Sequence, residues 1–220
     1  MYFEGTLTGM TYQGQRRDGD GESVEFRDAT TAVLVQTDAI NRHGTAICHD
    51  LLARDEPTAR NVLAIDFQQS ADQWLKDWKD DVGTMPNDLR LIVMEDAHRS
   101  TAIGEADSEP SDHKISPIGN PQDLTALGIK ITEAINEWET TGLEIAACLD
   151  SLSTMLQYTD FDPVFRFLHV FIRQLDSVGA TGHFHIDPTA HDQQTITRLL
   201  QLFDAVITIE DGTVVSVQER

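Results

Sequence analysis

The sequence predicts an α/β fold, a three-layer sandwich with helices on both faces of a mainly parallel sheet and a β-hairpin at the C-terminus. Three observations predict it. Short apolar runs alternate with helical patterns through most of the chain, as in parallel sheets. The runs are apolar almost throughout, which fits strands buried on both faces. Finally, Asp211-Gly212 stands between two alternating runs, which is a strong hairpin signal.

In the first half of the chain, short apolar runs predict three strands, at residues 31–36, 62–67 and 89–94. Helical spacing of apolar residues predicts helices at 43–54 and 70–80, and Ser70 is a suitable N-cap for the second. Residues 1–29 carry glycine, aspartate and arginine without a clear period, so we expect a flexible arm there.

The second half continues the alternation after residues 104–120, where Pro110, Pro117 and two glycines predict a long loop. Loops of this length are often functional. We therefore expect one domain over residues 30–220. The predicted helices are 121–138, 152–157, 161–177 and 188–203, and the predicted strands are 143–149, 180–186, 205–209 and 214–217.

Charge and composition exclude several function classes. The 220 residues hold 37 Asp and Glu against 16 Lys and Arg, for a formal net charge of −21. Such a chain repels phosphates, so we disfavour nucleic acid as a partner. No apolar run approaches the about 20 residues of a transmembrane helix. The first residues lack the pattern of a signal peptide, so we expect a cytoplasmic protein with no membrane partner.

The acidic excess is dispersed, with 24 Asp, 13 Glu and only four Lys. Molar salt shortens the Debye length to about 3 Å and screens self-repulsion. This pattern indicates a protein adapted to high salt; an ordinary acidic protein is the alternative.

A nucleotide-binding α/β protein would carry its phosphate loop after the first strand, at residues 37–45. A working loop reads G-x-x-x-x-G-K-[ST], with backbone amides around the phosphates and lysine on the β- and γ-phosphates. Here Gly44 matches the second glycine, but Thr45 stands at the lysine position and Asp38 would repel phosphate. We therefore expect no ATP hydrolysis.

The strand at 143–149 leads directly into Asp150 and Ser151. An apolar strand ending in aspartate is where phosphate-hydrolysing α/β proteins orient Mg²⁺. The competing interpretation is structural, with Asp150 or Ser151 capping the helix at 152–157.

The densest polar group is His183, His185, Asp187 and His191. Alternate residues of a strand share a face, so the first three should line up. Imidazoles with a carboxylate suit Zn²⁺ or another divalent ion. A hydrogen-bonded polar row, or a proton-sensitive His–Asp network, is the alternative.

Other reactive or bulky residues have ordinary explanations. Cys48 and Cys148 lie on apolar faces and are expected to be buried thiols. Trp74 and Trp78 are expected in the core. Arg166, His169 and Arg173 form a polar stripe on the helix at 161–177, which is either a solvated face or an interface for a neighbouring subunit's carboxylates.

Several segments resemble haloarchaeal RecA/KaiC-superfamily proteins of the HTR-like type. The matching segments are AVLVQTDAINRHGTAICHDLL, NPQDLTALGIKI, ACLDSLSTMLQYTDFDPVFRFLHV, GHFHIDPTAHDQQTI and LFDAVITIEDG. The resemblance implies a RecA-like core in which one strand separates the phosphate-loop strand from the Asp-ending strand. It implies ATP binding at residues 37–45 and Asp150 in the wider superfamily, and self-association. The missing lysine and first glycine depart from that pattern.

The sequence thus favours a non-catalytic regulatory or protein-interaction module, linked to signalling, with a vestigial nucleotide site at Asp38, Gly44, Thr45, Asp150 and Ser151. We expect no cofactor, Zn²⁺ included, and we expect a protein partner or self-association. Two alternatives remain: a protein that binds a nucleotide such as ATP–Mg²⁺, or a small ligand, without turnover, and a metal-dependent enzyme using the histidine group.

Overall fold

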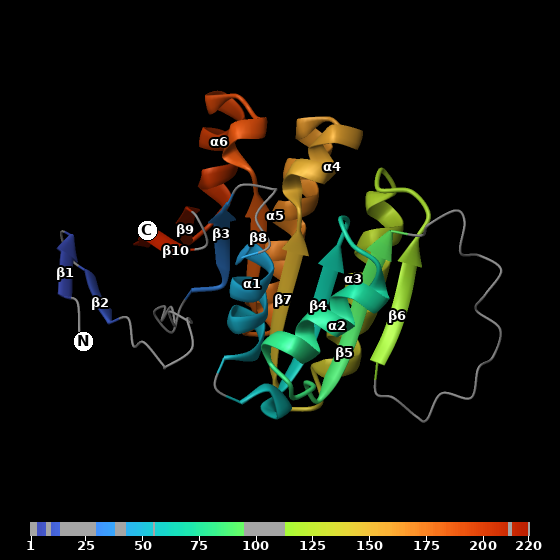
Figure 1. Cartoon of the computed structure of the whole chain (residues 1–220). Helices are drawn as coiled ribbons and strands as arrows, with labels where there is room; N and C mark the ends of the chain where they lie inside the picture. Colours follow the sequence, from blue (N-terminus) through green and yellow to red (C-terminus); the bar gives the residue numbers. More distant parts are fainter. Residues whose placement is uncertain are drawn as a thin grey trace.

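The computed structural model describes residues 4–7, 10–13, 30–37, 43–54, 56–94, 113–210 and 213–219. Its centre is an eight-stranded sheet in the order β10-β9-β3-β8-β7-β4-β5-β6 (Figure 1). All neighbouring strands are parallel except β9 and β10, which form an antiparallel hairpin. The predicted α/β sandwich with a mainly parallel sheet and a C-terminal hairpin is confirmed.

The strands of this sheet come from the whole length of the domain, and helices connect most of them. The strands are β3 (Ala32–Gln36), β4 (Arg60–Asp66), β5 (Asp88–Met94), β6 (His113–Ile118), β7 (Glu144–Asp150), β8 (Thr181–Ile186), β9 (Ala205–Glu210) and β10 (Thr213–Glu219). The helices are α1 (His43–Ala53), α2 (Ala71–Asp81), α3 (Leu124–Trp138), α4 (Leu152–Tyr158), α5 (Phe161–Ser177) and α6 (Gln193–Leu199). Three short 3-10 helices are η1 (Pro57–Ala59), η2 (Pro188–Ala190) and η3 (Leu200–Leu202).

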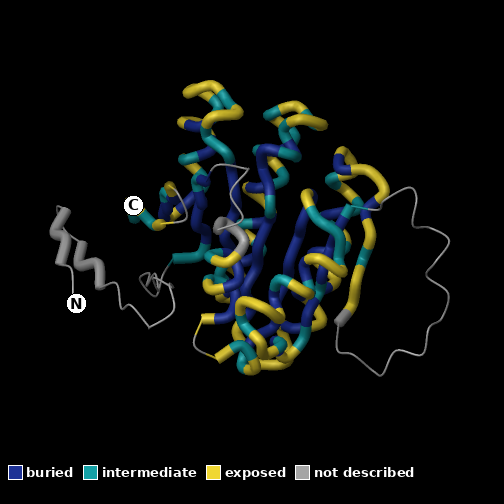
Figure 2. The backbone as a smooth tube through the Cα atoms, viewed as in Figure 1, coloured by how far each residue is buried: buried dark blue, intermediate teal, exposed yellow. Residues whose placement is uncertain are grey.

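The helices divide between the two faces of the sheet. Helices α1 and α2 cover one face, where Leu52 and Trp78 pack on Ala64 and Cys148. Helices α3, α4, α5 and α6 contribute to the larger core on the other face. The interior strands of the sheet are buried between these two layers, whereas the edge strands β6 and β10 are partly exposed (Figure 2). No helix in the described part of the chain is long and apolar enough to cross a membrane.

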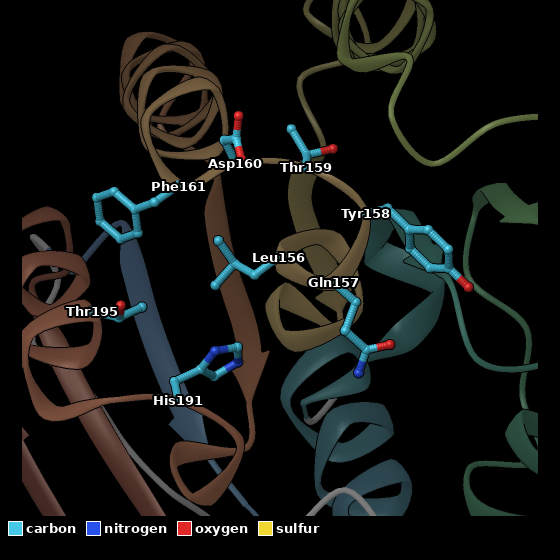
Figure 3. Close-up of a pocket in the computed structure, with 8 residues that line it drawn as sticks. All are labelled: Leu156, Gln157, Tyr158, Thr159, Asp160, Phe161, His191 and Thr195. Carbon is cyan, nitrogen blue, oxygen red and sulfur yellow. The ribbon is translucent and has the colours of Figure 1, made fainter.

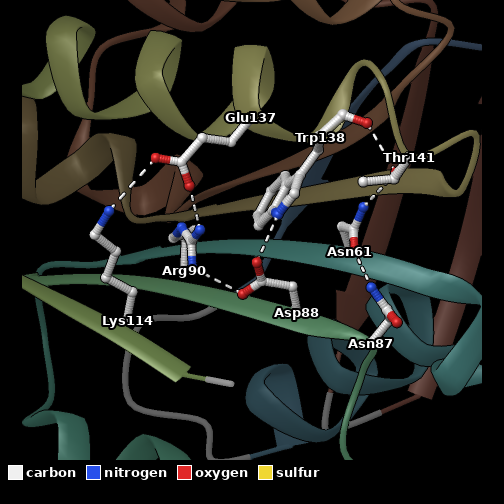
Figure 4. A network of polar contacts seen from close by, with 8 residues as sticks. All are labelled: Asn61, Asn87, Asp88, Arg90, Lys114, Glu137, Trp138 and Thr141. Atoms are coloured by element: carbon white, nitrogen blue, oxygen red, sulfur yellow. Dashed lines mark hydrogen bonds and ion pairs between the residues drawn. The ribbon is translucent and has the colours of Figure 1, made fainter. Parts of the chain in front are cut away.

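The amino-terminal edge of the sheet is fixed by a polar network (Figure 4). Asp88 accepts hydrogen bonds from the Trp138 indole at 2.9 Å and from Arg90 at 2.8 Å. Arg90 also pairs with Glu137, whose other carboxylate oxygen lies 3.5 Å from Lys114. This network joins α3 to β5 and β6 at the amino-terminal ends of the strands.

Three details differ from the sequence predictions. Residues 4–7 and 10–13, within the expected arm, form a two-stranded antiparallel hairpin, β1 (Glu4–Leu7) and β2 (Met10–Gln13). The end of the expected loop 104–120 is strand β6, which tolerates Pro117 because it lies at the sheet edge. The expected helix at 188–203 is split into η2, α6 and η3, because His191 is extended and Asp192 caps a new helix.

Candidate functional site

The carboxyl ends of β3, β8, β7 and β4 meet at one edge of the sheet, which is where open α/β sheets bind ligands. The register places Asp66 of β4 directly beside Asp150 of β7. Gln68 Nε2 donates to Asp150 Oδ1 at 2.6 Å, and the amides of Gln68 and Gln69 donate to Asp66 Oδ1 at 2.7 and 3.0 Å. Two adjacent carboxylates therefore mark the centre of this edge.

Burial changes the acidity of this carboxylate pair. Burial and the neighbouring Asp150 charge raise the pKa of Asp66 to about 7. Burial also raises the pKa of Asp150 above its usual value, although the His185 imidazole opposes that rise.

The segment predicted as a phosphate loop is described only in part. The Thr37 amide donates to the Ile186 carbonyl at 3.0 Å, which ties the end of β3 to β8. Asp38 lies outside the described residues. Gly44 and Thr45 lie in the first turn of α1, and only their backbone is described.

Ser151 is the N-cap of α4, which is the structural interpretation that the sequence left open beside Mg²⁺ orientation. Its hydroxyl accepts from the Thr154 amide at 3.2 Å and caps α4. Asp150, the other candidate, instead accepts from Gln68.

Beneath the carboxylates lies a cluster of two cysteines and two histidines, which we call the Cys–His cluster: Cys48, Cys148, His183 and His185. One ligand atom from each of the four side chains lies within 4.8 Å of the others. The two sulfur atoms are 2.9 Å apart, and His183 Nε2 is 3.1 Å from Cys48 Sγ. The two imidazole rings meet edge to face, with centroids 5.3 Å apart.

Strand register explains why these residues meet. Cys148 of β7 lies directly opposite His183 of β8. His185 is two residues further along β8 and therefore on the same face. Helix α1 follows β3 and returns over that face, which brings Cys48 onto the other three side chains. The exposed fractions are only 2–5%, so the cluster is sealed from solvent.

The cluster has unusual proton affinities. Burial alone would raise the pKa of the Cys48 thiol, but Cys148 and His183 hold it well below its usual value. Burial and the contact with Cys48 raise the pKa of Cys148 well above its usual value. Burial lowers the pKa of His183. Burial also opposes protonation of His185, but Cys48 and Asp150 raise its pKa to about 9.

The predicted His183, His185, Asp187 and His191 group does not form one site. Asp187 instead accepts from the Thr189 amide at 2.8 Å and caps η2, since the strand ends at Ile186. His191 lies 2.9 Å from the Ser153 hydroxyl. It lines a separate open cavity of about 310 Å³ between α4, α5 and α6 (Figure 3). The structure therefore brings His183 and His185 together with the two cysteines and places Asp187 and His191 outside that group.

Cys48 and Cys148 are buried, as predicted, but sequence reasoning missed that they meet the histidines. The only signal in the sequence was local: Cys148 and Asp150 share one face of β7, as His183 and His185 share one face of β8. The pairing of β7 with β8, which joins the two pairs, comes from the structure. Sequence reasoning also missed the contacts of His49, which is fully buried against the rings of Trp74 and Trp78. Its Nδ1 atom lies 2.7 Å from Asp81 Oδ2.

The predicted interface stripe on α5 lies at the surface. Arg166, His169 and Arg173 are all exposed. Arg173 is 3.6 Å from Asp176, and with His169 it borders a cavity of about 270 Å³.

Comparison with known proteins adds a family and a fold. A family model described as a family of unknown function, DUF7504, matches residues 30–209. The chain belongs to this DUF7504 family. No curated protein matches the sequence.

Solved structures from Pyrococcus horikoshii share the fold of this DUF7504 chain. A protein solved as Project ID PH0250 from strain OT3 is 9% identical, with a TM-score of 0.51 and 88% of each chain covered. The uncharacterized protein PH0321, solved with an unknown peptide, is 14% identical with a TM-score of 0.55, covering 83% of this chain and 78% of its own. At these identities the likeness concerns the fold alone.

Proposed function

We propose that this protein is a non-catalytic regulatory or protein-interaction module of a halophilic archaeon, built on a RecA/KaiC-like frame whose nucleotide site has lost its chemistry. The observation that carries the proposal is the missing phosphate-loop lysine. At the start of α1, Thr45 stands where a working loop carries the lysine that meets the phosphates.

The strand order supports the RecA-like part of this proposal. Strand β8 lies between β3, which precedes the degenerate loop, and β7, which ends in Asp150. That is the separation which the sequence resemblance implies. A RecA-like strand order around a phosphate loop without its lysine favours a binding role over ATP hydrolysis.

The start of helix α1 supports the loss of ATP chemistry. A phosphate loop opens its helix with lysine followed by serine or threonine, and that lysine meets the β- and γ-phosphates. Here α1 begins with His43, Gly44 and Thr45. The charge that would hold a triphosphate is therefore absent at Thr45, the lysine position of the motif.

Thermal unfolding in molar KCl, with and without millimolar ATP–Mg²⁺, tests this function. A ligand at about 100 times its Kd would stabilise the native state by about 2.7 kcal/mol. That is a rise in Tm of roughly 5–11 °C for a chain of this size. We expect no rise and no phosphate release.

The control is Asp150→Asn, which removes one carboxylate of the pair. A rise in Tm for the natural chain that this variant abolishes, without phosphate release, would instead establish the ligand-binding alternative. Phosphate release that depends on Asp150 would overturn the non-catalytic proposal.

A further inference from the structure

We propose that the Cys–His cluster is a structural Zn²⁺ site, with Cys48, Cys148, His183 and His185 as its four ligands. The inference does not depend on the proposed function, because the cluster is buried and its residues are not part of the degenerate nucleotide site. It begins from geometry. Four potential ligand atoms from α1, β7 and β8 lie within 4.8 Å of one another.

This spacing is close to that of a tetrahedral zinc site. Zn–S distances of about 2.3 Å and Zn–N distances of about 2.0 Å place neighbouring ligand atoms roughly 3.3–3.8 Å apart. The Cys48–Cys148 and Cys48–His183 separations of 2.9 and 3.1 Å are slightly shorter. Binding an ion would move the sulfur atoms apart by under about 1 Å, which side-chain adjustment can supply.

The donor set selects the metal. Two thiolates and two imidazoles suit Zn²⁺, whereas Mg²⁺ and Ca²⁺ prefer oxygen ligands. Two thiolates also balance the charge of Zn²⁺, so the loaded site is neutral. A neutral centre suits a position where each side chain is at most 5% exposed.

One buried atom points to a missing partner for the cluster. His185 Nε2 is shielded from solvent and has no hydrogen-bond partner in the described chain. A buried polar nitrogen without a partner is unfavourable. A metal ion held by the four side chains would give the His185 imidazole a partner.

Other arrangements of the cysteines explain less. A disulfide has an S–S distance of about 2.05 Å and would leave both imidazoles without a function. A set of hydrogen-bonded thiols accounts for the 3.1 Å contact of His183 with Cys48 but leaves His185 Nε2 unpaired. Four protein ligands also fill a tetrahedral site, which indicates a structural ion and not a catalytic one.

The experiment uses the untagged full-length chain, purified under reducing conditions in molar KCl and loaded with Zn²⁺ or Co²⁺. We expect about one tightly bound metal ion per chain after removal of excess ion. The Co²⁺ form should show the thiolate-to-metal charge transfer and intense visible bands of a tetrahedral sulfur-containing site. Chelation of the Zn²⁺ form should lower the Tm.

Two variants locate the ion. His185→Gln removes a cluster ligand and should reduce bound metal at least tenfold. The matched control is His191→Gln, which removes a neighbouring histidine outside the cluster and should retain the full complement. If His185→Gln does not fold, the Co²⁺ spectrum of the natural chain still decides.

Three results would overturn the proposal. One is less than about 0.2 metal ions per reduced chain, which excludes a stoichiometric site. Another is a Co²⁺ spectrum without thiolate charge transfer. The third is equal loss of metal in His185→Gln and His191→Gln.

Discussion

The contact between β8 and α5 gives the sharpest stability prediction. Gly182 lies on β8, and its position faces the core on the α5 side. A Cβ placed there would lie 2.6 Å from Leu175 Cδ1 and 3.2 Å from Phe184 Cε2. Ordinary contacts of this kind are 3.4–4 Å, so the Leu175 methyl group would have to move by roughly 1 Å in a close-packed interior.

Gly182→Ala should therefore destabilise the protein. Overpacking of a core costs about 1–3 kcal/mol, and the loss of chain entropy in the unfolded state offsets under about 1 kcal/mol of that. Leu175 is fully buried, which limits its escape into another rotamer. We expect a net loss of about 1–2 kcal/mol, or roughly 2–8 °C in Tm.

Urea unfolding at constant salt measures this loss, and two further variants make it specific. Leu175→Ala alone should cost about 2–5 kcal/mol, but combined with Gly182→Ala the losses should fall short of additivity by about 1 kcal/mol. Gly128→Ala is the control, because a Cβ at that helical position meets only Phe167 Cε2 at 4.0 Å and should stabilise. A neutral Gly182→Ala, or additive losses, would refute the packing argument.

Two other predictions concern charge. The hydrogen bond from Arg90 lowers the pKa of Glu137, so this pair stabilises the fold above the usual glutamate pKa and loses that contribution as pH falls through the lowered value. Glu137→Gln should cost under about 1 kcal/mol at pH 7. In urea unfolding this difference from the natural chain should shrink as the pH is lowered, and a difference that is independent of pH would contradict the argument. Self-association, measured by light scattering, should weaken as salt is lowered, because a net charge of −21 per chain opposes assembly. The double variant Arg166→Glu, Arg173→Glu makes the chain more negative and should weaken self-association further at each salt concentration. A monomer at every salt concentration would exclude self-association.

Local patterns predicted most of the fold because each strand and helix carries its own signal. The apolar face of α5 runs through Val164, Leu168, Phe171 and Leu175, all buried, and the predicted bounds of this helix are those observed. Strand β6 was missed because Pro117 and an exposed edge position weaken the strand signal. The break before α6 was missed because Pro188, a favourable first-turn residue, predicts the start of one helix over 188–203, whereas it starts η2 and Asp192 caps α6.

The candidate site was predictable only where it follows a single strand. A two-residue period placed His183 and His185 on one face, and that expectation holds. Cys48 and Cys148 stand 100 residues apart, and their meeting with the histidines depends on strand order and on the path of α1. Sequence spacing carries no record of such long-range register, so an observer of the sequence sees only two buried thiols.

Strand β3 lies inside the sheet, and this position has a consequence for the chain while it is being synthesised. Its neighbours in the sheet are β8 and β9, and the pairing of Ala32 with Gly182 spans 150 residues. At about 5–20 residues per second, ribosomes need roughly 8–30 s to make that stretch. During this time the apolar segment Ala32–Gln36 has neither of its partner strands. A nascent chain halted before residue 181 should therefore bind chaperones through this segment and release them once β8 emerges.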